Sequence, residues 1–179
     1  MEKSVSKSSS LSSPNAGMRM SSKALVGMRD TEKVMLRYYN DMGKNKGNCT
    51  WGIGFYVHKG VCSKEELERK VDVASVETEY AKRVAEAERR VRLKVNMPLD
   101  QAQFDALVSF TYNTRSATNQ RVYDALNSGN VDRATAIISG SVYVKVNGKA
   151  ILASGLVKRR AEESAPFRGS GNSRVEAKR

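Results

Sequence analysis

The sequence predicts an α+β fold that is mainly helical and includes one small β-hairpin region. Apolar residues recur at intervals of three and four in most segments after residue 63, which is the spacing of amphipathic helices. Before them, residues 49–58 form a β-rich run punctuated by glycines, which is typical of a hairpin strand. The chain of 179 residues can bury one good-sized core, and trimming both ends leaves one domain of about 140 residues.

Residues 30–40 predict a helix that carries an acidic side chain on its apolar face. Asp30 or Thr31 can cap its start, and apolar or aromatic residues follow Glu32 at i+3, i+4 and i+7. Glu32 is then either paired or partly shielded from water, and shielding favours the protonated form that a general acid needs. The simpler interpretation is a first-turn acid that the helix dipole favours.

A second acid and a hydroxyl follow that helix. Asp41 precedes a polar loop rich in glycine and asparagine, where we expect the carboxylate to stay ionised. Thr50 stands at the start of the β-rich run. Taken singly, Asp41 is an ordinary turn residue and Thr50 an ordinary β-branched strand residue, so neither identifies a site by itself.

Six helices are predicted in the rest of the chain. Ser63 and Glu66 form a capping box that begins the first of them. The second has broad polar faces and a length of about 27 Å at 1.5 Å per residue. The third is the most apolar and is expected to form the main core. The predicted helices cover residues 63–72, 75–92, 100–113, a segment that Gly129 stops, 130–138 and 154–165.

Three other segments are expected to be short or irregular. Residues 142–152 alternate around Asn147-Gly148, which favours a short hairpin or a loop. Residues 1–27 are rich in serine and poor in apolar residues, so they predict a disordered arm or linker. Residues 168–179 lack apolar content and predict a disordered basic tail.

The chain is basic, with 31 Lys and Arg against 19 Asp and Glu and a formal net charge of +12. Residues 1–28 and 168–179 each contribute +3, so the remaining +6 is spread over the core. Such a charge favours polyanions, which include nucleic acids, acidic membrane surfaces and the anionic polymers of a bacterial wall. No apolar run approaches the ~20 residues of a membrane span, and the N-terminal residues lack the apolar centre of a signal peptide.

Three blocks of sequence together resemble the phage-type lysozymes, glycoside hydrolase family 24. In the first, Asp41 lies nine positions after Glu32, and the segment Thr50-Trp51-Gly52-Ile53-Gly54 follows. The second block is 99–110 with Tyr112-Asn113, and the third is 155–160 followed by Glu163. The likeness covers residues 28–167, and it departs from the family pattern at Phe55, where the family often has histidine.

The resemblance implies a fold and a site. The fold would be two-lobed and lysozyme-like, with a small β-hairpin lobe and a larger helical lobe joined by a long helix. The activity would be that of a muramidase, with Glu32 as the acid, Asp41 as the stabiliser or base, and Thr50 as the hydroxyl that positions water. Tyr112 and Asn113 would bind substrate.

Further residues receive an expected role from the same resemblance. An arginine of the last helix, Arg159 or Arg160, would hold the catalytic glutamate, although adjacent helical arginines usually pair with carboxylates three or four residues away. Cys49 and Cys62 flank the expected hairpin, where a cross-link is sterically conceivable but two free thiols are more common in a reducing compartment. An enzyme that acts on the wall works outside the cytoplasm, which favours the disulfide.

We expect no cofactor and no metal, because Cys49, Cys62 and His58 do not form a ligand set of plausible spacing. The expected partner is peptidoglycan, and the expected state a monomer. Delivery without a signal peptide would be through a holin, as for a phage endolysin, or by a secretion system, as for an antibacterial effector with an immunity protein. Two rival functions are a non-catalytic wall-polymer binder and a nucleic-acid binder, the latter supported by net charge alone.

Overall fold

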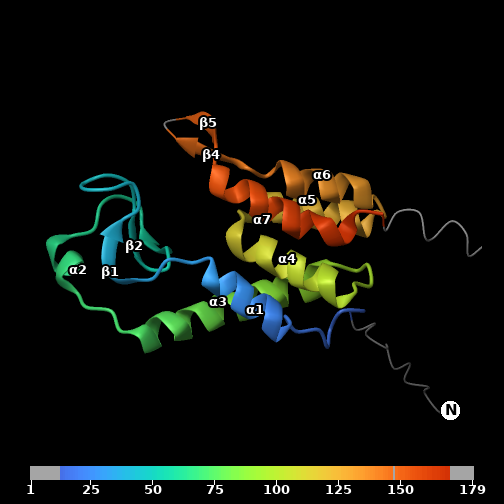
Figure 1. Ribbon diagram of the computed structural model, residues 1–179, viewed down its shortest axis with the longest axis horizontal. Helices are drawn as coiled ribbons and strands as arrows, with labels where there is room; N and C mark the ends of the chain where they lie inside the picture. Colours follow the sequence, from blue (N-terminus) through green and yellow to red (C-terminus); the bar gives the residue numbers. More distant parts are fainter. Residues whose placement is uncertain (1–12, 147, 170–179) are drawn as a thin grey trace, which may run out of the picture. The chain divides into compact units, whose positions relative to one another are not determined.

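The computed structural model describes residues 13–146 and 148–169 (Figure 1). The chain divides into two compact units. We call Ser21–Glu86 the sheet unit, and Ala87–Arg179 together with Met1–Met20 the helical unit. The longest helix, α3 (Val73–Lys94), contributes residues to both. The structure is mostly helical with small antiparallel sheets, which confirms the predicted fold class.

The sheet unit is built around three antiparallel strands in the order β1-β2-β3. Tyr39 of β1 lies opposite Thr50 of β2, and Thr50 in turn lies opposite Tyr56 of β3. Between the second and third strands the chain turns through two glycines with positive φ, a conformation that other residues rarely adopt. The elements of this unit before α3 are α1 (Ser22–Asp30), β1 (Met35–Asn40), β2 (Cys49–Gly52), β3 (Phe55–His58) and α2 (Lys64–Glu68).

The predicted helix over 30–40 is wrong, because most of that segment is strand β1. The Thr31 hydroxyl donates to the Met28 carbonyl at 2.7 Å, so Thr31 closes the preceding helix instead of opening a new one. Apolar residues at i+3, i+4 and i+7 do not exclude a strand, and pairing with β2 satisfies the backbone of Met35–Asn40.

The predicted disordered arm over 1–27 is wrong for the part that the structure describes. Ser21 caps α1 by accepting a hydrogen bond from the Ala24 amide. Earlier in the chain, the Asn15 side chain is buried and donates to the carbonyls of Val95 and Met97. One polar side chain thus ties a serine-rich segment to the helical unit, which composition does not reveal. Residues 1–12, and residues 170–179 of the predicted tail, lie outside the described residues.

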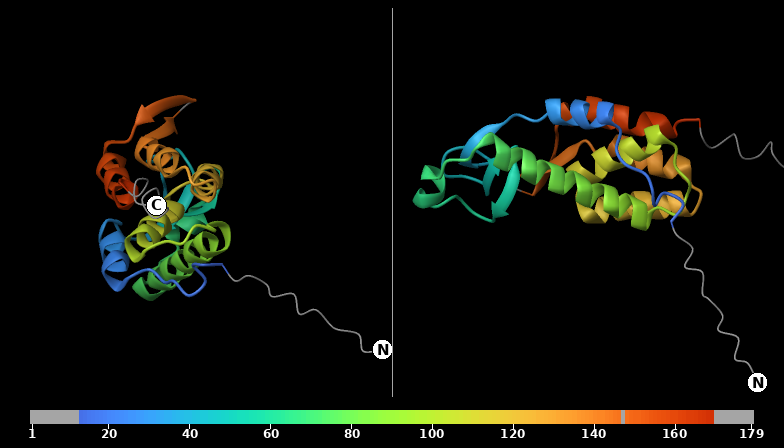
Figure 2. Two further views of the ribbon diagram at one scale, coloured as in Figure 1. Left: turned by 90° about the vertical axis from the view of Figure 1, so that its right-hand side faces the viewer. Right: turned by 90° about the horizontal axis from the view of Figure 1, so that it is seen from below.

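The helical unit confirms the helices predicted after residue 98. Its described helices beyond α3 are α4 (Gln101–Asn113), α5 (Ser116–Asn127), α6 (Val131–Gly140), α7 (Ser154–Ser164) and the short η1 (Ala165–Phe167). Asp100 and Gln103 form a capping box at the start of α4, and Asn130 caps α6. Figure 2 shows these helices lying along one another, and their core includes the fully buried Phe104, Leu107, Phe110, Leu126, Ile138 and Phe167.

Two smaller expectations have different outcomes. In the region where a short hairpin or a loop was expected, β4 (Tyr143–Val146) pairs antiparallel with β5 (Lys149–Leu152). The helix expected over 63–72 ends at Glu68, because Arg69 is extended and Lys70 bridges to Arg37. None of the helices in the described residues is long and apolar enough to cross a membrane.

Candidate active site

Glu32 lies just beyond the C-terminal end of α1, where its side chain is half-buried. Its amide donates to the Arg29 carbonyl at 3.1 Å, which continues the last helical turn. The prediction placed Glu32 in the first turn of a helix, near the positive end of the helix dipole. The observed position lies beyond the C-terminal end of α1, so that part of the prediction is wrong.

Arg29 braces the segment that carries Glu32. Its Nη2 and Nε atoms donate to Glu77 Oε1 at 2.5 and 3.1 Å, and its Nη1 donates to the Glu32 carbonyl at 3.5 Å. Its guanidinium also lies over the Tyr80 ring, 5.8 Å from the centroid. The hydrogen bond from Arg29 lowers the pKa of Glu77 below its ordinary value of 4.5. The backbone of Glu32 is therefore fixed from α3 through a charged pair.

Asp41 follows β1 directly and is exposed. Its Oδ1 accepts from the Asn48 amide at 2.7 Å, and its Oδ2 accepts from Asn48 Nδ2 at 3.2 Å. Two N–H donors orient the carboxylate and stabilise its negative charge. A Cβ atom on Gly47, which has a φ of +85°, would lie 2.0 Å from Asp41 Oδ1, so the loop needs glycine there.

Thr50 lies on β2 with only 4% of its surface exposed. Its hydroxyl donates to the Tyr39 carbonyl at 3.0 Å. A threonine hydroxyl has one proton and two lone pairs, so the oxygen keeps the capacity to accept a hydrogen bond from a water molecule. Because Tyr39 and Thr50 lie opposite each other, Asp41, two residues on, is the diagonal neighbour of Thr50 on the hairpin.

A disulfide joins Cys49 to Cys62 in the structure, with the two Cα atoms 4.6 Å apart. Cys49 immediately precedes Thr50, and both sulfur-bearing residues are buried. The Cys62 amide also donates to Asn40 Oδ1 at 2.8 Å. The strand that carries Thr50, the end of β1 and the segment before α2 are thereby tied together.

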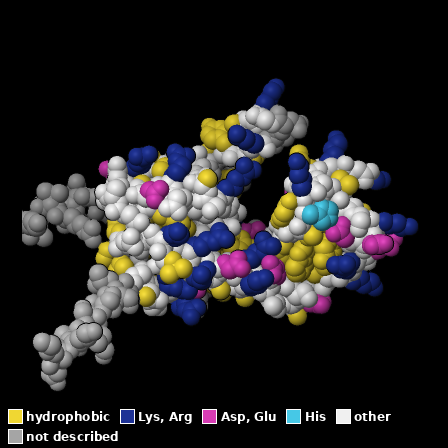
Figure 3. All heavy atoms as spheres, turned by 180° about the vertical axis from the view of Figure 1, so that it is seen from behind, with side chains coloured by type: hydrophobic (Ala, Val, Ile, Leu, Met, Phe, Trp, Pro, Cys, Tyr) yellow, Lys and Arg dark blue, Asp and Glu magenta, His cyan; other side chains and the backbone are white. Residues whose placement is uncertain are grey.

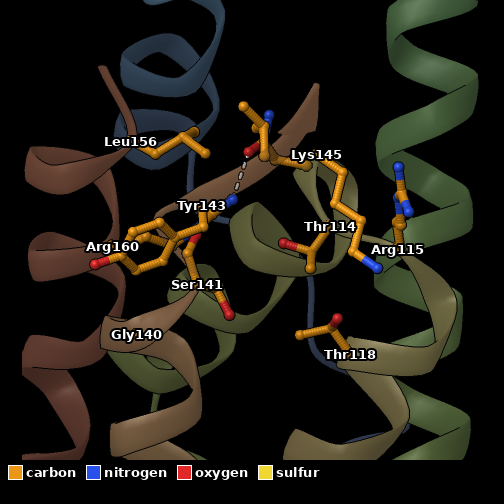
Figure 4. Close-up of a pocket in the computed structure, with 11 residues that line it drawn as sticks. Thr114, Arg115, Thr118, Gly140, Ser141, Tyr143, Lys145, Leu156 and Arg160 are labelled. Atoms are coloured by element: carbon orange, nitrogen blue, oxygen red, sulfur yellow. Dashed lines mark hydrogen bonds between the residues drawn. The ribbon is translucent and has the colours of Figure 1, made fainter. Parts of the chain in front are cut away.

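In the helical unit, Asn113 ends α4 and lines a cavity of about 360 Å³. Its Oδ1 accepts from Arg160 Nη2 at 2.6 Å, which leaves its amide nitrogen as a donor. Figure 4 shows the cavity between the start of α5, strand β4 and helix α7, with Lys145 and Tyr143 reaching in from the hairpin. Tyr112, the other predicted substrate residue, lies one position earlier and is half-buried.

The two predicted arginines differ in what they contact. Arg160 is 2% exposed and uses all three guanidinium nitrogens inside the helical unit, on Glu163, the Ser141 carbonyl and Asn113. Arg159 donates from Nε to Glu163 at 3.2 Å. Both pairings have the i+3 or i+4 spacing expected of helical neighbours. Arg160 therefore acts first as an internal residue that fixes Asn113.

The structure brings some of the predicted residues together. Asp41 and Thr50 share a hairpin, Glu32 lies at the other end of β1, and Asn113 contacts Arg160. Sequence reasoning missed Arg29, Glu77 and Asn48, which hold the two acids. Of these three residues, only Asn48 could have been suspected from the local sequence, because Asn and Gly are typical of loops whose side chains hydrogen-bond to nearby backbone.

Comparisons with known proteins indicate the family to which the chain is similar. Residues 29–163 match the family model described as phage lysozyme. The chain is 29% identical over 158 residues to an endolysin of Acyrthosiphon pisum secondary endosymbiont phage 1, a span of 84% of this chain and 98% of that protein.

Solved structures give the same picture. An endolysin from Escherichia coli O157:H7 phage FAHEc1 aligns with a TM-score of 0.67 at 28% identity, covering 86% of this chain and 96% of that chain. The muramidase domain of SpmX from Asticaccaulis excentricus shares the fold, with a TM-score of 0.64 at 22% identity over 84% of this chain and 97% of that one.

Proposed function

Because the chain belongs to the phage lysozyme family, whose members are glycoside hydrolases that act on peptidoglycan, we propose that it cleaves the β-1,4 bond between N-acetylmuramic acid and N-acetylglucosamine. The observation that supports this most is the spacing of Glu32, Asp41 and Thr50 within the matched residues 29–163. All three lie in the sheet unit, and polar contacts hold each of them.

Glu32 is the general acid of the proposed mechanism. Cleavage of a glycosidic bond needs a proton on the leaving oxygen, and a carboxyl group can deliver it. Arg29 and Glu77 fix the backbone beneath it.

Asp41 is the carboxylate that stabilises positive charge on the sugar or directs the attacking water. The two Asn48 donors fix the orientation of its carboxylate. Thr50 positions the water by accepting its hydrogen bond, since the Thr50 proton is used on the Tyr39 carbonyl. We therefore expect Thr50→Ser to retain more lytic activity than Thr50→Ala in a turbidity assay, and equal losses would contradict the role.

The reaction is proposed to invert the anomeric carbon. An inverting site keeps its carboxyl groups about 6.5–9.5 Å apart to admit a water, whereas a retaining pair is about 5 Å apart. The interval between Glu32 and Asp41 contains strand β1. A strand of six residues spans about 20 Å, which exceeds the spacing of either kind of pair, so this proposal rests on the likeness to family 24, whose members invert, and not on the interval.

One digestion tests both claims. Purified peptidoglycan is treated with the protein, and the new reducing ends are reduced with borohydride and identified by mass spectrometry. Reduced muramic acid is the expected product, and proton NMR of early product should show the α-anomer first. Reduced glucosamine, or binding without release, would overturn the muramidase assignment, and an initial β-anomer would overturn inversion alone.

Release through a holin is the delivery route that the named endolysin relatives favour over injection as an effector. Expression in the bacterial cytoplasm should then lyse cells only when a holin is co-expressed. Lysis without it would contradict the route.

A further inference from the structure

Beside the disulfide, the sheet unit holds a cluster of side chains that bind metals. Cys49 Sγ, an imidazole nitrogen of His58 and a carboxylate oxygen of Glu66 all lie within 4.8 Å of one another. Cys62, bonded to Cys49, brings a second sulfur to the same place. The cluster joins β2, β3, the segment before α2, and α2 itself. Sequence spacing concealed it because Glu66 had a sufficient explanation as a capping residue.

The spacing of the donor atoms suits a tetrahedral ion. His58 Nε2 lies 3.1 and 3.2 Å from the two Glu66 oxygens. Zinc bonds of about 2.0–2.1 Å to nitrogen and oxygen place such neighbouring donors about 3.3 Å apart. The His58 side chain is 44% exposed, and Figure 3 shows this imidazole, the chain's only one, at the surface, which gives an ion a path to the buried sulfur.

Surrounding groups already orient both exposed donors. His58 Nδ1 lies 3.1 Å from the Lys59 carbonyl and Nε2 lies 3.1 Å from a Glu66 oxygen. Both partners only accept, so each ring nitrogen donates in the disulfide form, and Nε2, which faces the cluster, gives up its proton when a metal binds. Glu66 Oε2 accepts from the Ser63 amide at 2.7 Å. In metal sites, the ring nitrogen of a histidine ligand that does not bind the metal commonly donates to a backbone carbonyl, and a carboxylate ligand commonly accepts a hydrogen bond. His58 and Glu66 have these outer contacts.

We propose that the dithiol form of this protein binds one Zn²⁺ through Cys49, Cys62, His58 and Glu66, and that the disulfide form does not. A dithiol reductant gives two electrons and two protons to the disulfide and becomes a disulfide itself. Binding of Zn²⁺ then releases the two thiol protons and the proton of His58 Nε2, and forms two thiolate–zinc bonds and one bond to the freed nitrogen. A small-molecule disulfide reverses the exchange: it takes two electrons from the two thiolates and two protons from water and becomes a dithiol. The protein disulfide that forms carries no thiolate charge, so the ion is released.

The ion and the disulfide would be alternative cross-links at one position. Each ties β2 to the segment before α2, and Thr50 follows Cys49 on that strand. In a reducing compartment the metal would hold this part of the sheet unit, and in an oxidising one the disulfide would replace it.

Metal titration of the full chain tests the proposal without measuring lysis, so its outcome is separate from that of the proposed function. The protein is reduced with a phosphine under nitrogen and titrated with Co²⁺, followed by competition with Zn²⁺. We expect one equivalent to bind the reduced protein, with thiolate-to-cobalt charge transfer and the visible bands of a tetrahedral site. The oxidised protein should show neither signal.

Variants separate this site from adventitious binding by thiols. His58→Gln and Glu66→Gln should each weaken Zn²⁺ binding by about tenfold or more. Gln at position 66 keeps the capping box, so α2 should survive, as circular dichroism can verify. Glu65→Gln, an exposed neighbour on the same helix, is the matched control and should bind as the parent does.

The double variant Cys49→Ser/Cys62→Ser should lose the charge-transfer signal entirely. The proposal is overturned if the reduced parent binds Zn²⁺ no more tightly than this double variant. It is equally overturned if both glutamine variants bind as tightly as the parent, since the two thiols alone would then account for the binding.

Discussion

The helical unit and the sheet unit are stabilised in different ways. Most of the largest fully buried side chains among the described residues belong to the helical unit, whereas the sheet unit contributes Phe55 and Val76. The sheet unit carries the disulfide, whereas charged pairs and guanidinium groups stacked over aromatic rings occur in both units, as for Arg83 over Phe55 at 4.6 Å and Arg160 over Phe110 at 4.9 Å.

This difference follows from what each unit does. A segment with little apolar core gains stability from cross-links and charged pairs, and it can leave polar side chains accessible for chemistry. The three proposed catalytic residues all lie in the sheet unit. The basic side chains visible in Figure 3 are spread over both units and form no single dense patch on that face, so charge gives no support to a nucleic-acid site there.

The largest effect should come from the chemistry of the sheet unit. Glu32→Gln should lower the rate of peptidoglycan lysis by about 10²–10⁴-fold, because the amide has the same shape but cannot deliver a proton. Its Tm should stay at the parent's value. Turbidity of purified wall and thermal unfolding provide the two measurements.

Asp30→Asn is the matched control, since Asp30 is an exposed acid at the end of the same helix. It should lyse as the parent does. If both variants lyse at the parental rate, Glu32 is not the acid, and the proposed catalytic role of the sheet unit is contradicted.

The next effect concerns the helical unit. Glu163 is 4% exposed and accepts hydrogen bonds from Arg160, Arg159 and Ser109. Glu163→Ala leaves the Arg160 charge buried without its partner, so the free energy of unfolding should fall by about 3–5 kcal/mol. Urea denaturation measures it. Glu162→Ala, one residue earlier and exposed, should change stability by less than about 0.5 kcal/mol, and a similar loss in both variants would contradict the buried network.

The helical unit was also the part that the sequence predicted best. Local signals and tertiary structure agree there: Asp100 and Gln103 cap α4, and apolar residues keep helical spacing around a buried core. In the sheet unit they disagree. The sequence of Met35–Asn40 has no strong strand pattern, and the segment becomes a strand because it pairs with β2. Thr31 caps the C-terminal end of a helix, although threonine is typical of the N-terminal cap.

The sequence predicted which residue types form the site, but it did not predict the residues that hold them in place. The order and spacing of Glu32, Asp41 and Thr50 are visible in the sequence. Glu77, however, lies 48 residues from Arg29, and no local pattern predicts that contact. Long-range charged pairs of this kind need the fold before they can be recognised.

A further prediction concerns the disulfide of the sheet unit. The cysteines are 13 residues apart, and Cys49→Ser/Cys62→Ser should lower the free energy of unfolding by about 3 kcal/mol in the chain-entropy description. Hydrogen exchange should show faster exchange for the amides of β2 and α2, and unchanged exchange for α4 and α6. Uniformly faster exchange in both units would contradict their separate means of stabilisation.

The smallest expected effect is that of the Arg29–Glu77 pair. The pair is partly exposed, so Glu77→Gln should cost only about 0.2–1 kcal/mol of stability. The pKa of Glu77 is lowered in the folded protein by Arg29, so the pair stabilises the fold above the ordinary pKa of 4.5, and this contribution disappears as the pH falls through the lower, folded value. The Tm difference between parent and variant should therefore be constant above about pH 5.5 and should shrink on acidification below 4.5.

Because Arg29 also holds the Glu32 carbonyl, the same variant should lower lysis more than Glu79→Gln, a matched acid that pairs with Arg83 on α3. A pH-independent Tm difference would contradict the stabilisation by the ionised pair. Equal lysis by the two variants would show that the pair does not position the proposed acid.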